Sequence, residues 1–186
     1  VVIARPGSGK TYTIVKKIEK ILEKSYEYQG IIAISYTKKA SRELEQRCKM
    51  TGISMKSSFF GTIDNFYISE IIMPFVKYFF NKRIELQVEA ELEKYPQYTI
   101  LRNIKNGINS QIEIALINAL AEGHIFLEIS GETALFVLSQ IPEAREYIQA
   151  KYTHIFIDEY QDCGNIQHEI FMKMISMGLL GIAVGD

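Results

Sequence analysis

Residues 4–11 read ARPGSGKT and bring glycine, lysine and threonine together in a pattern suited to binding phosphate. Gly7 and Gly9 let the backbone turn its N–H groups toward phosphate oxygens, because no Cβ obstructs the approach. Lys10 adds a point charge near the β- and γ-phosphates, and Thr11 supplies a hydroxyl for Mg²⁺. The predicted ATP and Mg²⁺ site therefore consists of Ala4, Arg5, Pro6, Gly7, Ser8, Gly9, Lys10 and Thr11.

Two adjacent carboxylates follow an apolar run in a second segment, where residues 155–162 read IFIDEYQD. In an open parallel sheet, ligands bind outside the carboxyl ends of the strands, which is also where a phosphate-binding loop lies. Asp158 is suited to hold the Mg²⁺ shell, and Glu159 can orient and deprotonate an attacking water. Because water needs a base, the glutamate favours hydrolysis over phosphoryl transfer to an alcohol.

The elements that would position these residues alternate between strand and helix. The apolar segments 1–4 and 31–34 read as strands, further strands are expected near 57–60 and at 154–157, and residues 38–50 and 165–177 have helical periodicity. The segment after the phosphate loop is also helical, since Ile14, Ile18 and Leu22 recur at helical spacing. This alternation predicts a parallel sheet wrapped by helices.

The character of the sequence changes between residues 68 and 150. Apolar residues recur there at helical intervals, broken by Pro96, Gly107, Gly123 and Pro142, and no clear strand alternation is visible. We therefore expect a mostly helical inserted subdomain at 68–150, within a discontinuous domain formed by 1–67 and 151–186.

Composition sets limits on the class of protein. The 186 residues are 47% hydrophobic and 23% charged with a net charge of −1, so any DNA-binding surface must be local, such as the basic stretch 38–56. No apolar run approaches the ~18 residues of a membrane span. Cys48 and Cys163 stand alone, which argues against zinc or a disulfide framework and favours a reduced, cytoplasmic setting. The absence of an initial methionine suggests a piece of a longer protein.

Four segments resemble, in order, motifs of the UvrD/Rep-like helicases of superfamily 1. They are ARPGSGKT at 4–11, SYTKKASREL at 35–44, GTIDNF at 61–66 and DEYQD at 158–162, and the final VGD at 184–186 looks like the opening of a fifth. The resemblance implies a RecA-like P-loop ATPase domain, a helical insertion, and a second RecA-like domain beyond this chain that supplies arginines to the γ-phosphate.

The resemblance also implies a role for individual residues. Tyr36 would stack on a base of single-stranded DNA, and Thr37 and Thr62 would bond its backbone. Lys38 and Lys39 would add positive charge, whereas Asp64 stands where histidine is common. Lys10, Glu159 and Gln161 would be the catalytic residues, with Gln161 coupling the nucleotide state to the DNA site.

Other interpretations remain open on the residues alone. Tyr36 by itself is better explained as a core tyrosine at a strand end. The chain could be a P-loop switch or kinase that does not act on DNA, or a DNA-binding module with a relic phosphate loop. ATP hydrolysis measured with and without single-stranded DNA distinguishes these from a motor.

Overall fold

The chain forms two compact units, which a computed structural model describes at residues 2–3, 10–81 and 83–185. Unit 1 consists of Val1–Phe66 and Arg145–Asp186, and unit 2 consists of Tyr67–Ala144. The division predicted from the sequence puts these boundaries at 67/68 and 150/151. The second observed boundary falls inside helix α7 (Pro142–Lys151), which contributes residues to both units.

Unit 1 is built on a five-stranded sheet in which every neighbouring pair of strands is parallel. In spatial order its strands are β1 (Val2–Ile3), β7 (Leu180–Gly185), β6 (Tyr152–Ile157), β2 (Gly30–Ile34) and β3 (Phe59–Gly61). Each of the four segments predicted to be strands contributes residues to this sheet. The prediction of an α/β fold with a parallel sheet is confirmed.

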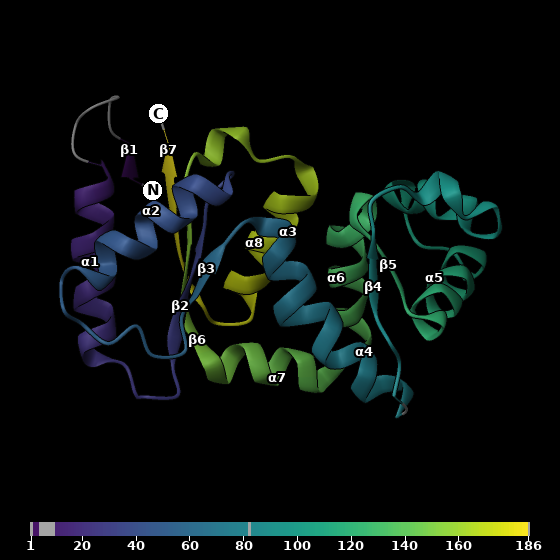
Figure 1. Ribbon diagram of the computed structural model, residues 1–186, viewed down its shortest axis with the longest axis horizontal. Helices are drawn as coiled ribbons and strands as arrows, with labels where there is room; N and C mark the ends of the chain where they lie inside the picture. Colours follow the sequence, from purple (N-terminus) through teal and green to yellow (C-terminus); the bar gives the residue numbers. More distant parts are fainter. Residues whose placement is uncertain (1, 4–9, 82, 186) are drawn as a thin grey trace. The chain divides into compact units, whose positions relative to one another are not determined.

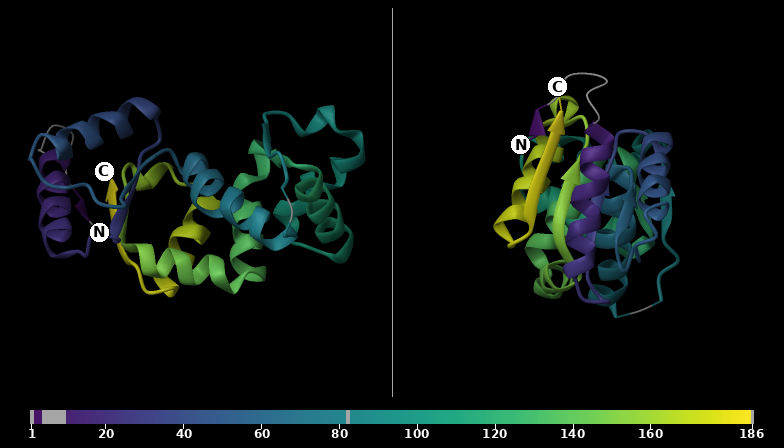
Figure 2. Two further views of the ribbon diagram at one scale, coloured as in Figure 1. Left: turned by 60° about the horizontal axis from the view of Figure 1, so that its bottom comes forward. Right: turned by 90° about the vertical axis from the view of Figure 1, so that its left-hand side faces the viewer.

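Helices cover both faces of this sheet. Figure 1 shows α1 (Lys10–Lys24) and α2 (Lys38–Lys49) on one side and α8 (Asn165–Ser176) on the other. In the right-hand view of Figure 2, α1 and α2 lie in front of the strands. Since both faces are buried, β2 is apolar at every position after Gly30, as its continuous burial requires.

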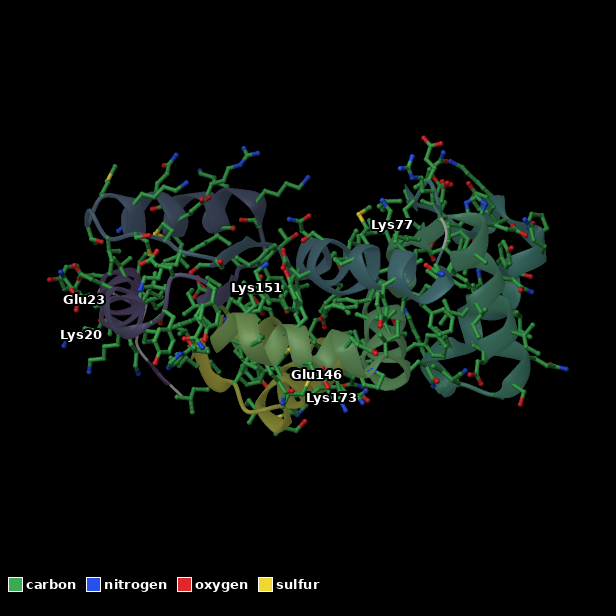
Figure 3. All side chains as sticks on the ribbon, turned by 90° about the horizontal axis from the view of Figure 1, so that it is seen from below. Lys20, Glu23, Lys77, Glu146, Lys151 and Lys173 are labelled. Carbon is green, nitrogen blue, oxygen red and sulfur yellow. The ribbon has the colours of Figure 1, made fainter. Side chains whose placement is uncertain are left out.

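Helix α1 is amphipathic, and its apolar side forms much of the core on the first face. Ile14, Ile18 and Leu22 are buried there in one cluster with residues of β2, α2, β6 and β7. In Figure 3, Lys20 and Glu23 project from α1 away from the sheet. This spacing of buried and exposed residues is what a helix packed on one side requires.

On the opposite face, the short helix α3 (Ile63–Phe66) follows β3 and is anchored by an aromatic cluster. Phe66 is fully buried, and its ring centroid lies 5.3 Å from that of Phe59 and 6.3 Å from that of Tyr152. Both pairs are edge-to-face, a favourable arrangement for aromatic rings. Phe66 therefore fixes α3 against β3 and β6.

Unit 2 is mostly helical. It contains a π-helix (Tyr67–Ile72), α4 (Met73–Phe80), α5 (Ser110–Glu122), α6 (Ser130–Gln140) and 3₁₀ segments at Leu92–Lys94, Pro96–Asn106 and Leu127–Ile129. It also holds a parallel pair that the sequence did not predict, β4 (Gln87–Glu89) with β5 (His124–Phe126). Strands of three residues are too short to show alternation. Among the described residues, no helix is long and apolar enough to cross a membrane.

Candidate functional site

The segments that follow the strands of unit 1 meet at one edge of its sheet, called the carboxyl edge below. Pairing sets Ile34 opposite Ile157, and Ile157 opposite Ala183. The next residue, Val184, lies opposite Val2 of β1. Since the strands are parallel, the chain leaves β1, β2, β3 and β6 at this same edge, where ligands of open parallel sheets bind.

The start of α1 is the described part of the predicted phosphate site. Ala4, Arg5, Pro6, Gly7, Ser8 and Gly9 lie outside the described residues. Lys10 and Thr11 are the first two residues of α1, so they lie where the helix has its partial positive charge and free N–H groups. Thr11, the second residue of the helix that follows β1, is half-buried and lies at the carboxyl edge.

Asp158 and Glu159 leave β6 at the carboxyl edge, as predicted from the sequence. The Asp158 N–H donates to the carbonyl oxygen of Ile34 at 3.0 Å and so continues the pairing of β6 with β2. The Glu159 N–H donates to Asp158 Oδ1 at 3.1 Å. Glu159 has the left-handed backbone angles φ 54° and ψ 47°, which cost a non-glycine residue about 1–3 kcal/mol and tend to occur at functional sites.

Gln161 holds the carboxylate of Glu159 by a direct hydrogen bond. Its Nε2 donates to Glu159 Oε2 at 2.7 Å, across a 3₁₀ turn at Tyr160–Asp162. The ring of Tyr160 lies against Phe171 of α8, with centroids 5.2 Å apart, and its hydroxyl is 2.5 Å from Nδ1 of His168. The turn that carries Gln161 is therefore attached to α8.

Tyr36 lies just after β2, and 43% of its surface is exposed. Because of this exposure, Tyr36 is not a buried core tyrosine at the end of a strand. The pKa of Tyr36 is raised, mainly because its hydroxyl is partly buried and to a lesser extent because the hydroxyl donates a hydrogen bond to Cys163. The tyrosine is thus linked to the segment that follows the acidic pair, while its ring retains a solvent-exposed surface.

The first turn of α2 also belongs to the carboxyl edge. Thr37 caps the helix, its Oγ1 accepting from the Ala40 N–H at 3.1 Å, so the hydroxyl hydrogen stays available for an acceptor such as a phosphate oxygen. Lys38 and Lys39 are exposed, and neither forms an ion pair with another described residue. Thr62, the half-buried residue after β3, leads into α3 at the same edge.

The hydroxyls and carboxylates at the carboxyl edge suit a magnesium triphosphate. Mg²⁺ prefers oxygen ligands and usually binds through one or two protein groups together with phosphate oxygens and water. The Thr11 hydroxyl and the Asp158 carboxylate are such groups, and both lie at the carboxyl edge. Among the described residues there is no group of three or more His, Cys, Asp or Glu side chains that could hold a metal ion.

Sequence reasoning assigned no role to Cys163, although it contacts Tyr36. A lone cysteine carries no pattern signal, and the contact joins segments that are distant in sequence. The sequence likewise indicates no separate role for Gly185, although the side chain of Gln161 lies directly against it. Neither proximity is encoded by local spacing.

The two cysteines should differ in reactivity toward iodoacetamide. Burial raises the pKa of the Cys48 thiol to about 11, and burial also raises that of the less buried Cys163. We expect slow labelling of Cys163 alone in the native protein at pH ~8, faster at higher pH because the thiolate reacts. Mass spectrometry of alkylated peptides measures both rates.

A Tyr36→Phe variant tests the contact between Tyr36 and Cys163. The hydrogen bond from Tyr36 lowers the pKa of Cys163, so its removal should raise that pKa further and slow alkylation at fixed pH. Tyr28→Phe, at an exposed tyrosine before β2, is the control. Equal rates in wild type and Tyr36→Phe would contradict the contact.

Comparison with known proteins gives a consistent result along the whole chain. The sequence profile of the UvrD/REP helicase N-terminal domain matches residues 1–122 and 116–186. The Gabija protein GajB of Bacillus cereus (strain VD045) is 34% identical over 181 residues, covering 93% of this chain and 33% of that protein.

Two ATP-dependent DNA helicases named PcrA are more distant relatives. The protein of Staphylococcus aureus (strain Mu50 / ATCC 700699) is 23% identical over 223 residues, covering 100% of this chain and 30% of the relative. That of Bacillus subtilis (strain 168) is 21% identical over 222 residues, covering 99% and 30%. The chain thus spans about a third of the length of the curated relatives it matches.

Proposed function

This chain belongs to the UvrD/REP helicase family through its N-terminal domain, and on that premise we propose that it is the ATP-binding and hydrolysing half of a motor that moves along single-stranded DNA. One observation carries the proposal. The start of α1, the acidic pair after β6 and the Tyr36–Thr37 segment after β2 lie at a single edge of one parallel sheet. Because they share one edge, the residues that would bind the nucleotide and those that would bind DNA can affect one another through short contacts.

The nucleotide would be held by the loop at residues 4–9 together with Lys10 and Thr11. Loop N–H groups and the N-terminus of α1 favour phosphate charge, and Lys10 adds a cation. Thr11 and Asp158 would hold Mg²⁺, which neutralises developing charge on the phosphates when it is bound. Ala4 and Arg5 complete the loop in this proposal.

Glu159 is the proposed general base for hydrolysis. Its carboxylate would take a proton from the water that attacks the γ-phosphate, a role that requires a fixed orientation. The left-handed backbone of Glu159 and the hydrogen bond from Gln161 both restrict that orientation. Gln161 would therefore act on the reaction through Glu159.

Single-stranded DNA would bind along the ends of β2 and β3. The exposed ring of Tyr36 offers a stacking surface with little sequence preference, which suits a motor that must move along any strand. The Thr37 hydroxyl can donate to a phosphate oxygen, and Lys38 and Lys39 add charge beside it. Thr62, the residue after β3, would make a further contact with the DNA backbone.

The full-length protein is expected to contain a second RecA-like domain. The relatives are about three times as long as the matched region, and phosphoryl transfer needs added positive charge at the γ-phosphate, which arginines of a second domain would supply. The isolated chain should therefore hydrolyse ATP poorly.

The cellular compartment that we propose is the cytoplasm, because two free cysteines suit a reducing environment.

The test compares ATP hydrolysis by the full-length protein with and without oligothymidylate. We expect stimulation by the DNA, and we expect Tyr36→Ala to weaken binding roughly 5- to 150-fold, the loss of about 1–3 kcal/mol of stacking. Fluorescence anisotropy with a labelled oligonucleotide measures the affinity. Tyr28→Ala, at a 62% exposed tyrosine before β2, is the matched control and should bind normally.

Three outcomes would count against this function. Hydrolysis without DNA stimulation would indicate a nucleotide switch or kinase instead. Unchanged affinity in Tyr36→Ala would remove the stacking role. Hydrolysis that persists in Lys10→Ala would show that the nucleotide is bound elsewhere.

A further inference from the structure

Building on the proposed hydrolysis, we infer that Gly185 is a positioning residue: the absence of a side chain at the end of β7 makes room for the Gln161 amide that holds the base Glu159. The turn after β6 and the last residue of β7 contact each other at the carboxyl edge. Gly185 therefore affects turnover rather than nucleotide affinity.

The two ends of the Gln161 amide have different neighbours. Nε2 donates to Glu159 Oε2 at 2.7 Å, while Oε1 lies only 2.3 Å from the point where a Cβ on residue 185 would be. Real Cβ atoms do not approach another atom so closely, so any side chain at 185 would displace the amide. In its observed position, the amide of Gln161 therefore occupies space that is open because residue 185 is glycine.

The need for glycine here comes from space and not from backbone conformation. Gly185 is not among the described glycines with positive φ, which are Gly52, Gly107, Gly123 and Gly178. Apart from Gln161, the nearest atom to a Cβ at 185 is the backbone nitrogen of Tyr160 at 3.5 Å, an ordinary contact. Alanine at 185 would therefore push the flexible end of Gln161 and leave the fold in place.

The position of Gly185 connects the proposed general base, Glu159, with the part of the sheet beside which the nucleotide would bind. Gly185 lies opposite Ile3, the last residue of β1, which directly precedes the predicted phosphate loop. Gln161 thus spans from the general base to the strand that is paired with β1. A displacement of the end of β7 would change the space left for the amide and so the orientation of Glu159.

The experiment measures kcat and KM for DNA-stimulated ATP hydrolysis by full-length Gly185→Ala, Gln161→Ala and the double variant. Each single variant should lower kcat by roughly 10- to 100-fold, as expected for loss of a hydrogen bond to a charged group. KM for ATP should stay within about twofold, since ground-state binding is untouched. The double variant should be no slower than Gln161→Ala, because both changes remove one contact.

Two further variants make the result specific. Gly164→Ala is the matched control, because its Cβ would lie 2.6 Å from Oε1 of another glutamine, Gln167, which forms no hydrogen bond with Glu159. This variant should keep wild-type kcat. Gln161→Glu keeps the shape beside Gly185 but removes the donor, and should lose kcat like Gln161→Ala. It tests the contact even if Gly185→Ala folds poorly, which circular dichroism would show.

Several results would overturn the inference. They are wild-type kcat in folded Gly185→Ala, an equal loss in Gly164→Ala, wild-type kcat in Gln161→Glu, or losses that multiply in the double variant. Failure of the proposed function looks different, because the wild-type protein would then show no DNA-stimulated hydrolysis. Normal stimulated turnover that is insensitive to Gly185→Ala rejects this inference alone.

Discussion

Replacing Glu159 with glutamine should reduce DNA-stimulated ATP hydrolysis by the full-length protein about 10²- to 10⁴-fold, the usual contribution of a general base. The amide cannot accept the proton of the attacking water at neutral pH. It preserves the size of the side chain, and its oxygen can still accept a hydrogen bond from Gln161 Nε2. ATP affinity, measured with a fluorescent nucleotide, should therefore change little.

The matched control for this prediction is Glu169→Gln, at an exposed carboxylate on α8. It removes the same charge from unit 1 without touching the carboxyl edge and should retain wild-type turnover. If Glu159→Gln kept turnover within a few-fold of wild type, the base would have to be another residue. Loss of ATP binding in Glu159→Gln would instead assign the residue to nucleotide binding.

Phe66→Ala should lower the free energy of unfolding by about 3–5 kcal/mol, the cost of removing a buried phenylalanine. The ring is fully buried and contacts Phe59 and Tyr152 edge-to-face, so its loss leaves a cavity between α3 and the sheet. The Phe66 N–H also donates to the carbonyl oxygen of Thr62 at 3.0 Å. A shifted α3 would therefore disturb the predicted DNA contact at Thr62 as well.

Urea denaturation followed by circular dichroism measures this loss of stability. Met50→Ala is the control, because Met50 belongs to the same unit but is 84% exposed, and surface changes usually stay within about ±0.5 kcal/mol. A loss below about 1 kcal/mol in Phe66→Ala would be inconsistent with the described packing.

Several local features could be predicted from the sequence because short-range patterns encode them. The apolar run at 31–34 predicted a strand buried on both faces, and it is the core of β2 (Gly30–Ile34). The helical spacing of Ile14, Ile18 and Leu22 predicted α1 and its buried side. The strand expected near 57–60 is observed slightly later, at Phe59–Gly61, because residues 56–57 form a turn after which the Ser58 N–H donates to the carbonyl oxygen of Met55 at 3.1 Å.

Local sequence patterns could not predict other features of the structure. The strands β4 and β5 have three residues each and are stabilised by pairing with each other, so neither shows alternation in sequence. The exposure of Tyr36 was also misjudged from the residues alone. An aromatic residue after a buried strand is often buried, and only the path of the chain after β2 leaves its ring in solvent.

By itself, the sequence determined which residue types follow each strand: the glycines, Lys10 and Thr11 after the first, Tyr36 and Thr37 after the second, and the acidic pair after β6. Those choices are local, since each group needs only its own strand and turn. Tertiary structure alone decided that the Gln161 side chain lies against Gly185, and that Tyr36 contacts Cys163. Such contacts depend on strand order and register, which bring together atoms that no spacing within a segment can relate.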